Sequence, residues 1–422
     1  MRHLGFSRAS SLAAALVVGG LAVGGCRPHN TLGVSPSVAV VAVASGAPAP
    51  AATTALAVAS APRPGPIPDY EPVAHIYTHM RVDMLSEALP ELLTELVGDV
   101  HTVEDYDPPP PPDEVDETTD RSLVWLRDYQ PIYVRRANGR LKLLRYLSEN
   151  PNRAVYMPLD AERAAIELHT GQAPDIETLP LLHENGNLVA MGRFIFVTER
   201  LLEQNAEPHE EPHLLQAGYE PRDPDAVLAL LAEAFERPVA DIVVLPRLPG
   251  ELTGHVDLFL MALDEKTVVV PQIRAEALAL GGTVAGEAEM AVAVQRFLDE
   301  VADRLDQLEL DVVRLPMVAP LYLPAEYEDA GDDWDYVYYS PANSLLVRTG
   351  LDARVLVPEV DLGDQSLALS FVERAYEGEW SAVLAAHGWT AVPVEATRLG
   401  RYLGLLRCVS ATEPAFGSLA GG

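Results

Sequence analysis

Apolar residues in the central and C-terminal parts of the chain recur every three or four positions, which is the spacing of amphipathic helices. This pattern predicts five helices, near residues 83–97, 160–170, 225–236, 286–308 and 366–386. Asp160 is a suitable N-cap for the second helix, and Gly388 is a suitable stop for the fifth. Helices are therefore expected at intervals along this whole segment.

Each predicted helix is followed by a short apolar run with the composition of a strand. The runs are VHTV, ETLPLL, IVVLPRL, VVRLPMV and TAVPVEA, and four of the five contain a proline. Hairpin-like segments come next. Residues 131–147 contain Asn138-Gly139, which is typical of a two-residue type I′ turn, and residues 256–270 form a second candidate pair of strands.

Helix, strand and hairpin recur five times, at a spacing of roughly 60–80 residues, and this repetition predicts an α/β fold built from similar units. A closed ring of five modules is one arrangement that fits. An ordinary α/β sheet with irregular insertions would show the same alternation, so the pattern leaves both open.

Composition narrows the class of protein. The chain has 422 residues, 48% of them hydrophobic, so wholesale disorder is excluded and there is ample material for a core. It carries 62 acidic and 30 basic residues, a formal net charge of −32, which argues against nucleic acid as a partner and favours cationic ligands. Two cysteines are too few for a disulfide scaffold or a four-thiolate zinc site.

The N-terminus has the layout of an export signal. Arg2 and Arg8 precede an apolar stretch over residues 11–25, and the Val-Gly-Gly-Cys that ends at Cys26 resembles the lipobox of bacterial lipoproteins. An ordinary secretory signal with a chance cysteine is the alternative. With Cys26 lipidated, Cys408 is the one free thiol of the mature chain. The expected location is the cell envelope, with a membrane anchor on an extracytoplasmic protein.

These features predict four segments. They are a lipoprotein signal peptide over residues 1–26, an Ala-, Pro- and Val-rich extended tether over 27–68, a catalytic domain over 69–416 and a short disordered tail over 417–422. The oligomeric state is left open.

Each module carries one unusual polar segment after its strand. The segments are Trp125-Leu126-Arg127-Asp128-Tyr129-Gln130-Pro131, His183-Glu184-Asn185-Gly186-Asn187, Thr253-Gly254-His255-Val256-Asp257, Ser340-Pro341-Ala342-Asn343-Ser344 and Leu405-Leu406-Arg407-Cys408-Val409-Ser410. Singly, each has a plain structural explanation: a surface ion pair for Asp128, a satisfied strand-end histidine for His255 and an inert buried thiol for Cys408.

Together, and in this order, the five segments resemble the agmatine deiminase and bacterial-type peptidylarginine deiminase family of guanidine-modifying enzymes. The resemblance covers about residues 70–415 and implies a five-module pseudo-symmetric α/β propeller, the pentein fold. It implies that Asp128 and Asp257 bind the guanidinium, that Cys408 is the nucleophile, that His255 is the general acid and base, and that Glu184 orients His255.

The resemblance also marks Asn343, Trp125 and Arg127 as substrate-binding candidates. The chemistry accounts for these residue types. Carboxylates can grip the planar guanidinium through paired N–H groups, and a thiolate can attack its central carbon. The implied reaction converts a guanidino group of agmatine or peptidyl arginine into a ureido group and ammonia, with no metal and no organic cofactor. Export favours peptidyl arginine, because agmatine serves cytoplasmic putrescine and polyamine synthesis in relatives.

Three positions depart from the family pattern. Gln130 and Asn185 stand where the family usually has glycine, and Arg407 stands where it has histidine. Asn185 tolerates a positive φ better than most residues. Gln130 and Arg407 are expected to change pocket shape or substrate choice. Arg407 could also lower the pKa of the Cys408 thiol, although adjacent side chains on a strand point apart.

Two acidic loops and one further motif leave other hypotheses open. Residues 104–120 and 326–339 are either solvated loops or a negative rim that attracts a cationic substrate. His209-Glu210-Glu211-Pro212-His213 matches the helical zinc motif of metalloproteases, but Pro212 interrupts the turn that must join the two histidines. A propeller that binds cationic peptides without catalysis is a third reading.

Overall fold

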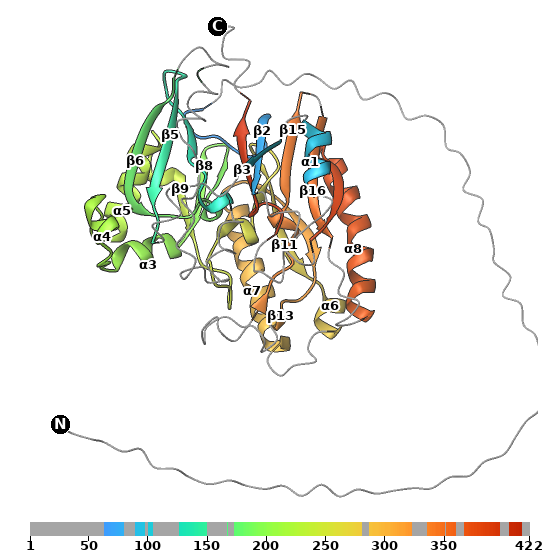
Figure 1. Ribbon diagram of the computed structural model, residues 1–422. Helices are drawn as coiled ribbons and strands as arrows, with labels where there is room; N and C mark the ends of the chain where they lie inside the picture. The colour runs from blue at the N-terminus through green and yellow to red at the C-terminus, as the bar shows by residue number, and fades with distance from the viewer. Residues whose placement is uncertain are drawn as a thin grey trace, which may run out of the picture. The chain divides into compact units, whose positions relative to one another are not determined.

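Five sheets in the described part of the chain share one plan, and four of them have three strands while the fifth has four (Figure 1). The computed structural model describes residues 63–79, 89–97, 100–103, 126–149, 167, 173–280, 287–322, 336–350, 352–359, 367–396 and 405–415. In each sheet a middle strand pairs antiparallel with one neighbour and parallel with the other.

The middle strands are β2 (Val73–His79), β5 (Leu141–Leu147), β8 (Phe194–Thr198), β11 (Thr267–Ile273) and β16 (Asp352–Glu359). Their antiparallel partners are β18 (Ser410–Pro414), β4 (Ile132–Arg135), β7 (Val189–Met191), β10 (Met261–Ala262) and β15 (Leu345–Thr349). Their parallel partners are β3 (Val100–Val103), β6 (Asp175–Leu182), β9 (Ile242–Leu245), β12 (Asp311–Met317) and β17 (Thr390–Glu395).

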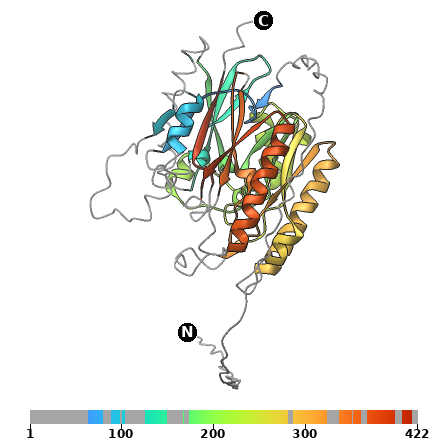
Figure 2. The ribbon, with the colours of Figure 1, turned by 90° about the vertical axis from the view of Figure 1, so that its right-hand side faces the viewer.

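Parallel neighbours require a crossover, and helices supply it. The crossovers are α1 (Leu89–Val97), α3 (Arg200–Ala206) with α4 (Pro212–Gln216) and α5 (Pro224–Ala234), α6 (Ala275–Leu280) with α7 (Glu287–Asp306), and α8 (Leu367–Ala386). The longest helices, α7 and α8, lie on the outside of the strands (Figure 2). In four modules the middle strand, its helical crossover and the parallel strand therefore form a βαβ unit, whereas the crossover between β5 and β6 lies outside the described residues except for position 167.

The ring closes through the two ends of the domain. The C-terminal strand β18 is the antiparallel partner of β2, with Ala411 opposite Tyr77. Because β2 comes from the start of the domain, the first and last segments complete a single module. The pairing confirms the predicted closed ring over the ordinary open sheet.

The helix and strand predictions hold wherever residues are described. Helices α1, α7 and α8 lie within the predicted ranges, and α5 begins one residue before its range. The five apolar runs predicted as strands form the parallel strands β3, β6, β9, β12 and β17. Gly388 has a φ of 80° just beyond α8, so it ends that helix as predicted. The predicted helix near 160–170, with Asp160, lies outside the described residues except for position 167.

The predicted hairpin turns need correction. Only Gly139 has a positive φ, whereas a type I′ turn requires one at Asn138 as well. The connection is five residues long: Gly139 N donates to Arg136 O at 2.9 Å, and the Asn138 side chain accepts from Arg140 N at 3.0 Å. In the second candidate pair the residues from Val256 to Leu258 form a 3-10 turn, and the first strand is only the short β10.

The segment before residue 69, predicted as the end of the tether, also contributes structure. Strand β1 (Gly65–Pro66) adds to the edge of β4, with Gly65 opposite Arg135. A separate short pair consists of β13 (Leu321–Tyr322) and β14 (Tyr336–Val337), so the end of the second acidic segment lies in a strand. The first acidic loop, the signal peptide and Cys26 lie outside the described residues. In the described part of the chain, no helix is long and apolar enough to cross a membrane.

The closing sheet gives a direct test of the ring. Ile76 lies in β2 between β3 and β18 and is 0% exposed, whereas Ile176, also in a strand, is 38% exposed. Ile76→Ala should lower the free energy of unfolding by about 2–4 kcal/mol, because it leaves a cavity in the core. Ile176→Ala should cost less than about 1 kcal/mol. Urea unfolding measures both, and equal losses would contradict the closure described.

Candidate active site

Five short turns bring one polar segment from each module to the centre of the ring. Four of them are 3-10 turns that lie just before the first strand of a module. They are η3 (Leu126–Asp128), η5 (Asn185–Asn187), η7 (Val256–Leu258) and η9 (Pro341–Asn343). The fifth turn spans residues 406–409 and precedes β18. Adjacent turns contact one another in the order η3, η5, η7, η9. Residues that are far apart in sequence therefore share one site.

Buried side chains hold these turns in place. Asn187 Oδ1 accepts a hydrogen bond from Thr198 N at 2.9 Å, and the Thr198 hydroxyl donates to Gly254 O at 2.5 Å. These two bonds tie η5 to the loop before His255 through strand β8. Ser340 caps η9 by accepting from Ala342 N at 3.1 Å.

The thiol of Cys408 lies in this centre and is 6% exposed. It donates to Asn343 Oδ1 at 3.4 Å, so Asn343, predicted as a substrate-binding residue, contacts the thiol itself. Burial raises the pKa of the Cys408 thiol well above its usual range, and Asp257 and Asp128 raise it further. The resting site therefore holds a neutral thiol facing two carboxylates.

His255 is clamped between two carboxylates from other modules. Its Nε2 lies 2.9 Å from Glu184 Oε2, and its Nδ1 lies 3.7 Å from Asp128 Oδ1. Burial alone would lower the pKa of His255, but Asp128 and Glu184, with help from Asp257, outweigh it and raise the pKa to about 10. The imidazole is therefore charged at neutral pH and is held ready to donate a proton. The predicted pairing of Glu184 with His255 is observed.

The three residues Asp128, Glu184 and His255 could also be considered as metal ligands, since their donor atoms lie within 4.8 Å of one another. However, the two ring nitrogens of His255 face different carboxylates. An ion bound to either nitrogen would break one of these contacts, so the arrangement is better suited to holding a proton.

The zinc motif does not form the helical site that it requires. His213 lies in α4, which begins at Pro212, and its Nε2 lies 3.0 Å from Ser148 O. His209 precedes this helix and packs against the ring of Tyr219. The two histidines do not share one helical face, as the proline predicted.

A glycine permits the close packing of His255 and Asp128. A Cβ on Gly186 would lie 2.4 Å from His255 Nδ1 and 3.0 Å from Asp128 Oδ1. The H-E-N-G-N segment therefore needs glycine at this position for close approach rather than for an unusual φ. Asn185, for which tolerance of positive φ was the concern, does not have a positive φ.

Asp257 is fully buried and already has one cationic partner, Arg407. The Arg407 Nη1 donates to Asp257 Oδ2, while Asp257 Oδ1 has no hydrogen-bond partner among the described residues. The net pKa of Cys408 is raised rather than lowered, and the Arg407 guanidinium is turned toward two aspartates, so Arg407 does not make Cys408 a thiolate in the resting site.

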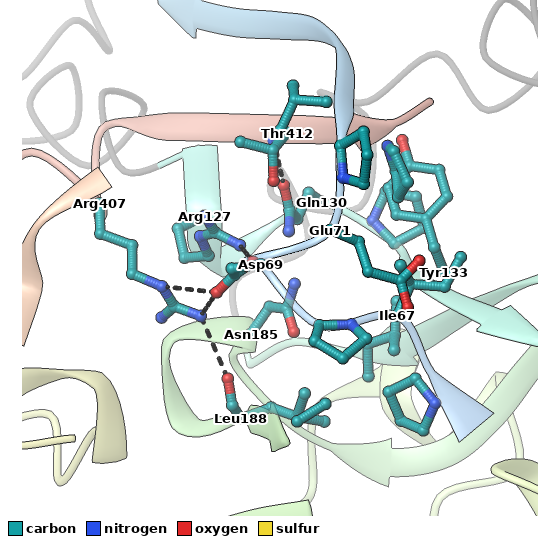
Figure 3. Close-up of a pocket in the computed structure, with 18 residues that line it drawn as sticks. Ile67, Asp69, Glu71, Arg127, Gln130, Tyr133, Asn185, Leu188, Arg407 and Thr412 are labelled. Atoms are coloured by element: carbon teal, nitrogen blue, oxygen red, sulfur yellow. Dashed lines mark hydrogen bonds and ion pairs between the residues drawn. The ribbon is translucent and has the colours of Figure 1, made fainter. Parts of the chain in front are cut away.

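The second of these aspartates is Asp69, which sequence reasoning did not identify. Its Oδ2 accepts from Arg407 Nε at 3.0 Å and from Nη2 at 2.5 Å, and its Oδ1 accepts from Arg127 Nη1 at 3.2 Å (Figure 3). Burial opposes ionisation of Asp69, but Arg407 and Arg127 outweigh it and lower its pKa to about 2. An acidic residue between β1 and β2 carries no motif signal, and its partner Arg407 is 338 positions away.

Arg127, a predicted substrate-binding residue, lies with Asp69 and Arg407 along a cavity also lined by Gln130, Asn185 and Leu188 (Figure 3). Cys408 and His255 do not line this cavity. Gln130 is buried, and its side chain accepts from Thr412 N at 2.9 Å, so this departure from glycine helps join η3 to β18. Trp125 lies outside the described residues.

Two further residues lie beside the site: Tyr146, which is partly buried, and His183, which is buried. The Tyr146 hydroxyl donates to the backbone oxygens of Asp128 and Gln130, at 2.9 and 2.8 Å. His183 packs edge-on against the Tyr146 ring, and burial, with a smaller effect of His255, lowers its pKa to about 3. His183 is thus neutral beside the charged His255.

The five-module arrangement is also found in solved deiminase structures. The chain matches a C. jejuni agmatine deiminase with 14% identity and a TM-score of 0.53, over 83% of this chain and 96% of that one. It matches an Enterococcus faecalis agmatine deiminase with 15% identity and a TM-score of 0.54, over 83% and 96%. A Porphyromonas gingivalis protein, provisionally assigned as an arginine deiminase, gives 17% identity and a TM-score of 0.56, over 84% and 99%.

These likenesses establish the fold. The chain has the fold of the agmatine deiminases, and the predicted five-module α/β propeller is confirmed. No protein-family model matches the sequence, and no curated protein matches it.

The close approach at Gly186 can be tested by one methyl group. Gly186→Ala should reduce turnover of a guanidino substrate at least about 100-fold, because the new Cβ displaces His255 from Glu184 and Asp128. Gly378→Ala is the matched control, since nothing lies within 4 Å of a Cβ there and turnover should be unchanged. Steady-state kinetics on both variants measures the effect. Normal turnover in the Gly186→Ala enzyme would refute the close packing of Gly186 against His255 and Asp128.

The charge on His255 should appear in the pH dependence of stability. Its pKa is raised from 6.5 to about 10, so its contribution is fully present below pH 6.5 and is lost as the pH rises to 10. The stability difference between wild type and His255→Gln should therefore shrink over this range, by on the order of a few kcal/mol. Urea unfolding at pH 6 and pH 10 measures it. A difference that stays constant would mean that His255 is not held charged.

Proposed function

We propose that this chain is a hydrolase that converts a guanidino group into a ureido group and ammonia through a covalent adduct on Cys408. The observation that supports this most strongly is the meeting of Cys408, His255, Glu184 and two aspartates from separate modules at one centre. The fold shared with agmatine deiminases agrees with it.

Substrate binding would begin with the attraction of the cationic guanidinium to the carboxylates of the site. Asp128 and Asp257 both act on the Cys408 thiol, and a guanidinium between them would face the thiol with its central carbon. Asp257 Oδ1 is buried without a hydrogen-bond partner among the described residues, and an N–H of the guanidinium supplies the missing donor. Asn343 Nδ2 is likewise buried without an acceptor in the described part of the chain.

The bound cation also activates the nucleophile. The two aspartates raise the pKa of the Cys408 thiol, so a guanidinium that neutralises them lowers it again. The thiol proton leaves to solvent as the thiolate forms, and the thiolate sulfur bonds to the guanidinium carbon. Activation therefore depends on the cationic substrate, which limits reaction of the free thiol.

His255 then serves both halves of the reaction. Its imidazolium donates a proton to the departing nitrogen, which leaves as ammonia when the C–N bond breaks, and a thiouronium on Cys408 remains. The neutral imidazole next takes a proton from water as the oxygen bonds to the same carbon. Breaking of the C–S bond then releases the ureido product, the hydroxyl proton passes to solvent, and the thiolate takes up a proton again as the product leaves. Glu184 and Asp128 keep the ring oriented throughout.

Agmatine and peptidyl arginine are the proposed substrates. The matched structures include agmatine deiminases, one of them described with substrate bound. The lipobox-like sequence at Cys26 supports an extracytoplasmic, membrane-anchored enzyme, and that location favours peptidyl arginine.

The test is a colorimetric ureido assay on agmatine, free arginine and an arginine peptide. Cys408→Ala should abolish the product, since no other group in the described site can form the adduct. Cys26→Ala is the matched control: it should keep full activity and move the protein from the membrane fraction to the soluble fraction. No product from the wild type on any substrate, or full activity in Cys408→Ala, would refute the proposal.

A further inference from the structure

Each of two buried arginines immediately precedes a residue of the proposed site, and one carboxylate binds both. Arg127 precedes Asp128, Arg407 precedes Cys408, and Asp69 bonds to the two guanidinium groups (Figure 3). We propose that Asp69 is a positioning residue that sets the charge and the orientation of the guanidinium subsite through Arg127 and Arg407.

Asp69 fixes the orientation of the Arg407 side chain. Asp69 holds Arg407 through Nε and Nη2, which leaves Nη1 directed at Asp257 Oδ2. This bond fixes one oxygen of Asp257, so the other, Oδ1, is left for a ligand. Rotation of Arg407 away from Asp69 would therefore also release the Asp257 carboxylate.

The backbone shows that the same turns are already joined. Arg127 N donates to Cys408 O at 3.0 Å, and Arg407 N donates to Asn343 O at 3.4 Å. The turn that carries Asp128, the turn that carries Cys408 and the turn that carries Asn343 thus form one hydrogen-bonded unit. Asp69 adds a second, side-chain link between the first two of them.

Asp69 also balances positive charge beside the guanidinium subsite. Arg127 and Arg407 bring two positive charges beside a subsite for a cation, and Asp69 and Asp257 balance them. In Arg127, Nε and Nη2 have no hydrogen-bond partner among the described residues, so Asp69 is its main counter-ion. Burial, with repulsion from Arg407, lowers the pKa of Arg127. Without Asp69 the pair would leave one positive charge uncompensated at the site.

This excess charge predicts two effects of opposite kind. A cationic substrate should bind more weakly, whereas the Cys408 thiolate should form more easily. The charged groups that bear on Cys408 are Asp257 and Asp128, which raise its pKa, Arg127, which interacts with it, and the neighbouring Arg407. His255 is held by Asp128 and Glu184 and remains charged. A purely structural role for Asp69 would not lower the pH at which the thiol reacts.

Asp69→Asn is the decisive variant, made in the full chain. The rate of iodoacetamide alkylation, followed on the Cys408 peptide by mass spectrometry, should rise at lower pH than in the wild type. The KM for a cationic guanidino substrate should rise about tenfold, with a smaller change in kcat. The KM effect rests on the proposed function, but the alkylation profile does not, so an inactive wild type with a shifted profile would refute only the proposed function.

Glu71→Gln is the matched control. Glu71 lies two residues away in the same segment and pairs with Arg135 at 2.5 Å, and its side chain is 26% exposed against 24% for Asp69. The Glu71→Gln substitution removes the same charge, but Arg135, the partner of Glu71, is not next to a site residue in the sequence. An Asp69→Asn profile and KM that match those of Glu71→Gln would overturn the proposal.

Asp69→Glu covers the case in which Asp69→Asn does not fold. The charge is retained, so the alkylation profile should stay at the wild-type pH. The longer side chain displaces Arg407 and with it Asp257, so KM should still rise several-fold. A wild-type KM in a folded Asp69→Glu enzyme would overturn the positioning role.

Discussion

Burial of the Asp257 carboxylate is the constraint around which the centre of this molecule is arranged. Its side chain is 0% exposed, and a carboxylate in that position is stable only with a cation or several donors beside it. Arg407 supplies the cation on one side. That guanidinium is itself buried and requires Asp69, which in turn binds Arg127. Charges thus alternate in one continuous row through the core.

Charge balance also determines the arrangement of the site around His255. His255 is charged because Asp128 and Glu184 enclose it, and its charge in turn offsets theirs. The pKa of the Cys408 thiol is high because the thiol is buried and because Asp257 and Asp128 lie near it, so this part of the site is still short of positive charge. A cationic ligand completes the balance. The preference for a guanidinium and the activation of the thiol then have one physical origin.

Much of this could be predicted from the sequence, because it depends on local patterns. The three- and four-residue spacing located α1, α5, α7 and α8, and the apolar runs located the parallel strands. The order of polar segments, through its resemblance to a known family, selected Cys408, His255 and Glu184 as candidates, and the structure brings them close together. The hairpin at Asn138-Gly139 was also located, but its turn type was not, since the dipeptide suits more than one loop length.

Long-range ion pairs could not be predicted in this way. Asp69 and Arg407 meet only because β18 returns to pair with β2, and neither residue type marks its partner in the sequence. The sequence also left open the direction in which the Arg407 side chain points. It lies in a turn rather than a strand, so the alternation of side chains along a strand does not apply to it.

The covalent step on Cys408 is the central claim, and an acid-quenched turnover experiment tests it most directly. The protein is mixed with a guanidino substrate, quenched during turnover and digested, and the peptides are weighed by mass spectrometry. The account predicts a substrate-derived thiouronium on the Cys408 peptide, which disappears once the substrate is consumed. Ureido product that forms without any adduct on Cys408 would contradict it.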